Sequence, residues 1–116
     1  QRSGPEHKRT AIRRLMEAYP LMPFVLIGDS GQRDPLTYEE MAREFPGRVK
    51  LILIRQVGDD DDERNTALRS HAETLRDEGI PLHLVSDASS AAEIVRDLGL
   101  CDDETLAEVA IEIQAN

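Results

Sequence analysis

The sequence predicts an α/β fold with a parallel sheet, and two observations support this prediction. Short runs of consecutive apolar residues, typical of strands buried on both faces of a sheet, recur along the chain. Between them lie stretches whose apolar residues follow the spacing of amphipathic helices. Strands that alternate with helices form parallel sheets through right-handed crossovers. We therefore expect a three-layer, Rossmann-like architecture with about three strands and flanking helices.

The first helix and the first strand are predicted within the first thirty residues. The apolar residues of the helix fall at i, i+3, i+4 and i+7, and Pro20 and Pro23 end the helix. Residues 24–27 then form a wholly apolar run, which predicts a buried strand that ends at Gly28 and points its carboxyl end at Asp29. The apolar residues of the predicted helix are Ile12, Leu15, Met16 and Tyr19.

Two helices and a strand are predicted in the middle of the chain. Thr37 and Glu40 have the spacing of a capping box, which predicts a short helix over residues 38–44. Val49–Arg55 is predicted as the second buried strand. After an acidic loop, the spacing of apolar residues predicts a helix over residues 63–78.

The C-terminal part is predicted to contain one strand and two helices. Residues 81–85 predict a short third strand. Ser90 and Glu93 form another capping box, which predicts a helix that continues through Leu98. A last helix is predicted from the spacing of Leu106, Val109, Ala110 and Ile113.

The length and composition fit one small domain, which we expect to cover residues 1–116. Apolar residues make up 40% of the chain and charged residues 32%, a balance typical of soluble globular proteins. Three strands make a thin sheet, and its two open edges would pair readily with other strands. We therefore expect the remaining strands to come from residues upstream of Gln1 or from another chain.

The charge and the cysteine content narrow the classes of function. A formal net charge of -9 repels polyanions and no long basic stripe is present, so we expect no nucleic-acid partner. Cys101, the single cysteine, cannot form an internal disulfide. No apolar stretch reaches the length of a membrane span or matches a signal peptide. The sequence therefore predicts a soluble, cytoplasmic protein.

The turn after the first strand contains the residues best suited to bind a ligand. Asp29 and Asp34 lie in this turn, and ligands of open parallel sheets bind at the carboxyl ends of the strands. Gly28 and Gly31 permit a close approach of the backbone, and carboxylate oxygens are ligands suited to Mg²⁺. A magnesium ion held there would bridge to a phosphate. From the spacing alone, a polar turn in which both aspartates cap backbone N–H groups explains the pattern better.

A longer pattern resembles a known family. It consists of several short segments that occur together and in order in the first half of the chain. These segments closely resemble the catalytic domain of the actin-patch-associated phosphatidate phosphatases, which belong to the haloacid-dehalogenase-like (HAD-like) superfamily. The resemblance is dense over residues 8–57 and looser beyond them. The residues that carry it are Lys8, Tyr19-Pro20, residues 24–35, Tyr38, Phe45-Pro46 and Ile54-Arg55-Gln56-Val57.

The resemblance implies a HAD-like fold and the hydrolysis of a phosphate monoester, such as phosphatidate, through an aspartyl-phosphate. It implies that Lys8 is the catalytic lysine, which neutralises charge on the nucleophile and the phosphoryl oxygens. Arg9 is the nearest substitute, and a solvated lysine at a helix start explains Lys8 equally well. The resemblance also implies that Asp29 coordinates Mg²⁺ and that Asp34 ligates it directly, through water or by positioning a ligand.

Two arginines are candidates for binding an anionic substrate. Arg33, inside the turn, could reach an anionic headgroup, although an exposed surface role explains it equally well. Arg55, at the end of the second strand, is the better candidate to face the site or to pair with a carboxylate. His7, His71 and His83 are too scattered for zinc spacing, so we expect no histidine ligand.

The chain departs from the family at the nucleophile. The superfamily pattern Asp-x-Asp-x-Thr or Asp-x-Asp-x-Val is absent after every apolar run, and the aspartates at 59–62 follow Gly58 in a predicted loop. We therefore expect upstream residues to supply the nucleophile and the isolated chain to be inactive. The alternative is a non-catalytic HAD-like module that binds a partner through the turn or an open sheet edge.

Overall fold

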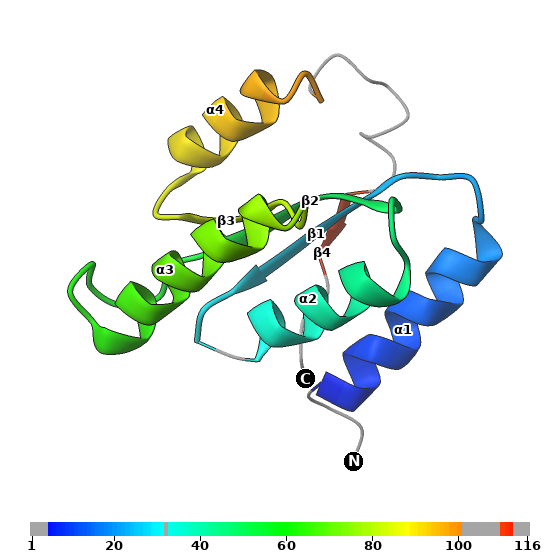
Figure 1. Cartoon of the computed structure of the whole chain (residues 1–116), viewed down its shortest axis with the longest axis horizontal. Helices are drawn as coiled ribbons and strands as arrows, with labels where there is room; N and C mark the ends of the chain where they lie inside the picture. Colours follow the sequence, from blue (N-terminus) through cyan, green and yellow to red (C-terminus); the bar gives the residue numbers. More distant parts are fainter. Residues whose placement is uncertain (1–4, 32, 101–109, 113–116) are drawn as a thin grey trace.

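The computed structural model describes residues 5–31, 33–100 and 110–112. In the described part of the chain, helices and strands alternate from the first helix onward (Figure 1). The helices are α1 (Pro5–Ala18), α2 (Asp34–Glu44), α3 (Glu63–Asp77) and α4 (Ala88–Asp97). The strands are β1 (Phe24–Asp29), β2 (Val49–Arg55), β3 (Leu82–Val85) and β4 (Ala110–Glu112).

The strands form one parallel sheet in the order β3-β2-β1-β4. The central pair is β1 and β2, which run side by side from Phe24 opposite Val49 to Asp29 opposite Arg55. The sheet has one strand more than the three predicted, because Ala110–Glu112 pairs with β1. The predicted α/β class with a parallel sheet is confirmed.

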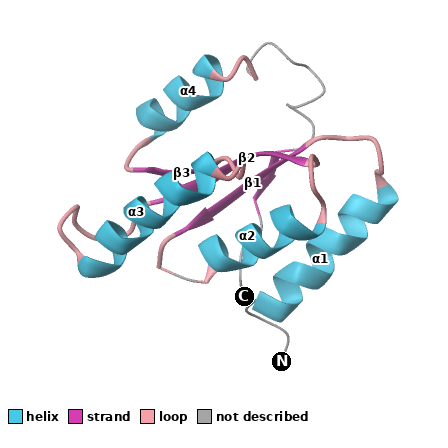
Figure 2. Ribbon diagram, in the orientation of Figure 1, coloured by secondary structure: helices cyan, strands magenta, loops and turns pink. Residues whose placement is uncertain are grey.

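The helices lie on both faces of the sheet, so the architecture has three layers (Figure 2). Side chains of successive strand residues point to opposite faces. Leu26 and Ile52 accordingly contact the layer formed by α1, α2 and α3. Val25 and Leu53 belong to a second apolar cluster, which packs against α4. The site described below therefore rests on a central strand pair that is covered on both faces.

The start of α2 differs from the prediction. The helix begins at Asp34, not at residue 38, and Arg33 is its N-cap. Proline at 35 lies in the first turn, where its missing N–H leaves no hydrogen bond unmade. The predicted capping box is wrong, because Thr37 lies inside the helix. Prolines favour the first turn of a helix, so the proline was the better signal of the helix start.

The C-terminal part contains two further corrections. Asp87, not Ser90, is the N-cap of α4, and its side chain accepts the N–H of Ser90 at 2.7 Å. The last predicted helix is wrong at Ala110, which lies in β4, because pairing with β1 overrides the local helical spacing. Three other residues of that prediction, Leu106, Val109 and Ile113, lie outside the described residues, as does Cys101.

None of the helices that the described residues form combines the length and the apolar character that crossing a bilayer requires.

Candidate active site

The carboxyl ends of β1 and β2 bring several polar side chains together. β1 ends at Asp29 and β2 ends at Arg55, and the parallel register places these two residues opposite each other. The chain then turns from β1 into α2, which begins at Asp34. Ligands of open parallel sheets bind at this edge. The edge formed by these strand ends therefore contains the residues that the sequence predicts to bind a ligand.

Lys8 of α1 lies in this group as a buried residue. It shares one helix face with Ile12 and Met16, at i, i+4 and i+8, and its side chain is 2% exposed. Its ammonium donates a hydrogen bond to Asp34 Oδ1, so the two side chains form a buried ion pair. Arg9, the substitute considered from the sequence, points elsewhere and pairs with Glu40 at 2.8 Å. Of the two cations, only Lys8 contacts an aspartate of the turn.

Asp34 also holds the end of β1. Its second oxygen, Oδ2, accepts the backbone N–H of Asp29 at 3.1 Å. This contact requires a glycine at 28, because a Cβ atom there would lie 2.4 Å from Asp34 Oδ2. Gly28 is therefore needed for the close approach of the backbone to a carboxylate, while its φ is not positive.

Asp29 presents its carboxylate at the surface of this edge. Its Oδ1 accepts the backbone N–H of Gly31 at 2.9 Å, which closes a tight turn. Its Oδ2 lies 3.9 Å from the Arg55 guanidinium, a long and weak ion pair because the Arg55 side chain is 70% exposed. The Asp29 side chain is 24% exposed, so of the two aspartates it is the one that a ligand can reach.

Two residues of this edge were not predicted from the sequence. Ser30 is buried, and its hydroxyl accepts the N–H of Val57 at 2.8 Å. Arg64, at the start of α3, donates from Nη1 to the carbonyl of Ser30 at 3.3 Å. No local spacing marks either residue, because both act through segments that lie far apart in the sequence.

The two predicted substrate-binding arginines lie on different elements, Arg33 at the start of α2 and Arg55 at the end of β2. Arg33, the N-cap of α2, is exposed and forms no ion pair with any other described residue. Arg55 is exposed and faces Asp29, as its predicted place at the strand end required. Both guanidinium groups are available to an anion that approaches this edge of the sheet.

The aspartates differ in their suitability as magnesium ligands. Both oxygens of Asp34 already accept hydrogen bonds, and its side chain is only 4% exposed. Asp29 has one oxygen, Oδ2, whose nearest partner is the distant Arg55. Among the described residues, no group of three or more histidines, cysteines and acidic residues could hold a metal ion. Asp29 therefore fits as one magnesium ligand, but the described residues supply only part of the roughly six oxygens that Mg²⁺ requires.

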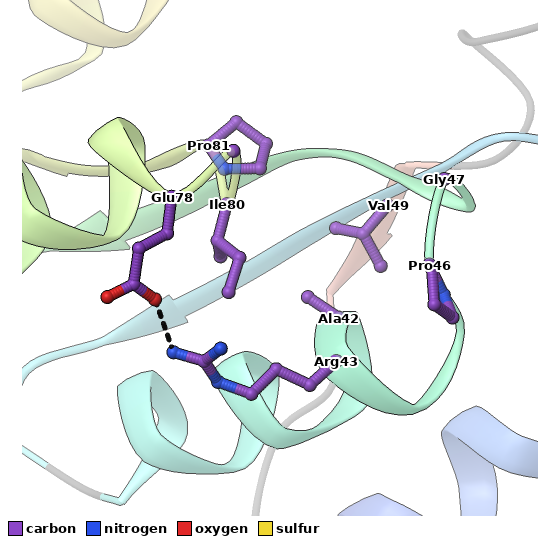
Figure 3. A pocket seen from close by; sticks show the side chains of 9 residues that line it. Ala42, Arg43, Pro46, Gly47, Val49, Glu78, Ile80 and Pro81 are labelled. Carbon is purple, nitrogen blue, oxygen red and sulfur yellow. Dashed lines mark hydrogen bonds and ion pairs between the residues drawn. The ribbon is translucent and has the colours of Figure 1, made fainter.

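A cavity of about 350 Å³ lies at the other end of the strands, near the amino ends of β2 and β3. Its walls come from the ends of α2 and α3 and are bridged by an ion pair of 2.8 Å between Arg43 and Glu78 (Figure 3). None of the site residues described above lines it. The cavity and the polar edge are thus separate features of the molecule.

Two of the three histidines, His71 and His83, lie on elements other than the aspartate turn. His83 is half-buried on β3, and its burial, with a smaller effect of the nearby Arg76, lowers the pKa of its imidazole. His71 lies on α3 and contacts Glu39 at 2.9 Å. Neither of the two forms a hydrogen bond or an ion pair with Asp29 or Asp34. That no histidine is a ligand stays a prediction.

Comparison with known proteins adds evidence for the first half of the chain. The profile of the family described as "Phosphatidate phosphatase APP1, catalytic domain" matches residues 1–56. The chain is also similar to phosphatidate phosphatase APP1 of Saccharomyces cerevisiae, with 34% identity over 53 residues, or 46% of this chain. It spans 9% of the yeast protein's length. No solved structure matches it significantly. Residues 1–56, which contain Lys8, the turn and β2, are therefore similar to part of the catalytic domain of the phosphatidate phosphatase APP1 family.

Proposed function

We propose that this chain is the metal-binding part of a HAD-like, magnesium-dependent phosphohydrolase that acts on a phosphate monoester such as phosphatidate. The observation that carries the proposal is the connected arrangement of Lys8, Asp34 and Asp29 at the carboxyl ends of the strands. It lies within the residues that match the phosphatidate phosphatase family. Reaction through an aspartyl-phosphate requires an attacking carboxylate, which a segment outside this chain would supply.

Each of the three residues has a separate task in this proposal. Asp29 is the magnesium ligand, because its carboxylate is the more accessible of the two. Asp34 acts by positioning, since it holds the Lys8 ammonium with one oxygen and the Asp29 backbone with the other. Lys8 offsets negative charge at the site. When bound, Mg²⁺ would supply the stabilisation of charge on the transferred phosphoryl group.

Arg33 and Arg55 would bind the anionic substrate. Both are exposed; Arg33 ends the turn that contains Asp29, and Arg55 lies opposite Asp29 at the end of β2. Guanidinium groups bind phosphate oxygens through paired hydrogen bonds. Because the Arg55 guanidinium is 3.9 Å from the Asp29 carboxylate, it can bind an approaching phosphate without the loss of a strong ion pair.

Release of inorganic phosphate from phosphatidate tests this proposal. In the full-length protein that contains this chain, Asp29→Asn should lower kcat by at least about a hundredfold, because transition-state charge is left uncompensated. Asp61→Asn, in the exposed loop before α3, is the matched control and should retain full activity. Unchanged activity of Asp29→Asn would refute the assigned role. The isolated chain should release no phosphate, since the superfamily's nucleophile pattern is absent from its sequence.

The isolated chain should also bind Mg²⁺ only weakly. Asp29 is a single accessible carboxylate, and Mg²⁺ gives up its water ligands reluctantly, so we expect a Kd on the order of millimolar. Titration calorimetry on the wild type and on Asp29→Ala would measure it. Micromolar binding by the wild type would mean that the site is complete without a further segment, which contradicts the proposal.

The second candidate function is that of a non-catalytic HAD-like module. The absence of the nucleophile pattern from the chain favours it. An Asp-x-Asp pattern after an apolar strand upstream of this chain would argue against it. Conversely, a full-length protein that lacks this pattern and releases no phosphate would favour the module over the enzyme.

A further inference from the structure

Ser30 connects the aspartate turn to the segment that follows β2. The residue is 2% exposed, although it lies between the partly exposed Asp29 and the exposed Gly31. Its backbone N–H donates to the Arg55 carbonyl at 2.9 Å, and its hydroxyl accepts the Val57 N–H at 2.8 Å. A buried hydroxyl with such a partner fixes the distance between two segments.

The contacts of Ser30 lie beside those that orient Asp29. Gly31, whose N–H binds Asp29 Oδ1, approaches the same Val57, because a Cβ atom at 31 would lie 3.5 Å from Val57 Cγ2. Arg64 of α3 also reaches this turn and donates to the Ser30 carbonyl at 3.3 Å. The turn is therefore attached to the end of β2, to the segment that follows it and to α3.

We infer that Ser30 is a positioning residue that holds the Asp29 carboxylate in the orientation needed to bind a divalent cation. This inference rests on the proposed role of Asp29 as a metal ligand. Asp34 holds the Asp29 backbone from the α2 side, and Ser30 holds the next residue from the β2 side. The two contacts restrain the backbone on both sides of the Asp29 side chain and thereby restrict its direction.

A merely structural role would have a different consequence. If Ser30 only satisfied the buried N–H of Val57, then Ser30→Ala would lower stability but leave cation binding by the folded chain unchanged. If it positions Asp29, then the folded Ser30→Ala chain should bind a divalent cation about tenfold more weakly, as is typical when a group that orients a metal ligand is lost. Cation binding by the folded chain separates the two roles.

The test uses Mn²⁺, a paramagnetic ion that takes the same oxygen ligands as Mg²⁺. Mn²⁺ is titrated into the isotope-labelled chain, and line broadening of the Gly31 amide signal is followed by NMR. The variants are Asp29→Asn, Ser30→Ala and Ile80→Ala. Ile80 is buried near the amino end of β3, so its truncation lowers stability without contact with the turn. Thermal unfolding of each variant establishes that the titrated chain is folded.

We expect the Gly31 signal of the wild type and of Ile80→Ala to broaden at the same Mn²⁺ concentration. Ser30→Ala should need about tenfold more Mn²⁺ for the same broadening. Asp29→Asn should show no specific broadening. Equal titrations of the wild type and Ser30→Ala, with Asp29→Asn still defective, would overturn the role of Ser30 alone. Equal titrations of the wild type and Asp29→Asn would overturn the proposed metal role of Asp29 as well. If Ile80→Ala needed as much additional Mn²⁺ as Ser30→Ala does, then lost stability alone would explain the weaker binding. That result would overturn the inference.

Discussion

The ammonium of Lys8 and the carboxylate of Asp34 form a buried ion pair between the first turn of α1 and the first turn of α2, across 26 residues of sequence. Two charges inside a protein are tolerated only when they are paired, because each alone carries a large desolvation cost. The pair therefore ties the position of α1 to that of the aspartate turn. Any change of one partner should affect both the fold and the site.

Removal of Lys8 should be strongly destabilising. Lys8→Met leaves the Asp34 carboxylate buried without its partner, and we expect a loss of about 3–5 kcal/mol in the free energy of unfolding. Arg9→Met is the matched control, because the Arg9–Glu40 pair is partly exposed and should contribute at most about 1 kcal/mol. Urea denaturation measures both values. Equal losses for the two variants would contradict the buried pair, and Lys8→Met combined with Asp34→Asn should regain part of the loss.

The glycine before Asp29 should not tolerate a side chain. Gly28→Ala places Cβ within 2.4 Å of Asp34 Oδ2, so the carboxylate or the strand must shift, and we expect a loss of roughly 1–3 kcal/mol or more. Gly31→Ala is the control, because its Cβ would meet Asp29 Oδ1 at 3.4 Å and nothing closer. Thermal unfolding of the two variants should rank Gly28→Ala well below Gly31→Ala. The reverse order would show that Asp34 does not lie against the backbone at 28.

The N-cap of α3 offers a test of the acidic loop. Asp62 accepts the N–H groups of Arg64 and Asn65 at 2.8 and 3.4 Å, so Asp62→Ala should cost about 1 kcal/mol. Asp61, its exposed neighbour, caps no helix, and Asp61→Ala should change stability by less than about 0.5 kcal/mol. Chemical denaturation compares the two. A cost at Asp61 equal to that at Asp62 would mean that charge, rather than capping, sets the effect.

His83 should make the stability of the protein depend on pH. Burial lowers the pKa of its imidazole in the folded state, while the unfolded chain has an ordinary value of about 6.5. Below that value the unfolded state binds more protons than the folded state, so stability falls as the pH decreases through 6.5 toward the folded-state pKa. His83→Gln should remove this part of the decline. Denaturation at several pH values measures it, and identical slopes for wild type and variant below pH 6.5 would contradict the prediction.

The strands were predictable because each is a local run of apolar residues. Val49–Arg55 was predicted with the bounds that the structure has, and β1 differs only at its carboxyl end. The helix starts were less predictable, since capping-box spacing at Thr37 and at Ser90 occurs inside helices as well as before them. The sequence also contains a signal for the burial of Lys8. Lys8 falls at helical spacing before Ile12 and Met16, which places it on the buried face of α1.

By itself, the sequence determined the α/β class, the order of the elements as far as α4, and the place of Asp29 and Arg55 at strand ends. The reason is that a strand buried on both faces consists of consecutive apolar residues, which can be recognised locally. Only the tertiary structure decided which charges meet. Lys8 pairs with Asp34, and Ser30 is likewise hydrogen-bonded to Val57, in each case across more than twenty residues of sequence. Local spacing carries no information about such distant partners. The same reason applies to Ala110, which has helical spacing in the sequence but pairs with β1 in the structure. The neighbouring strand provides hydrogen-bond partners for the backbone there.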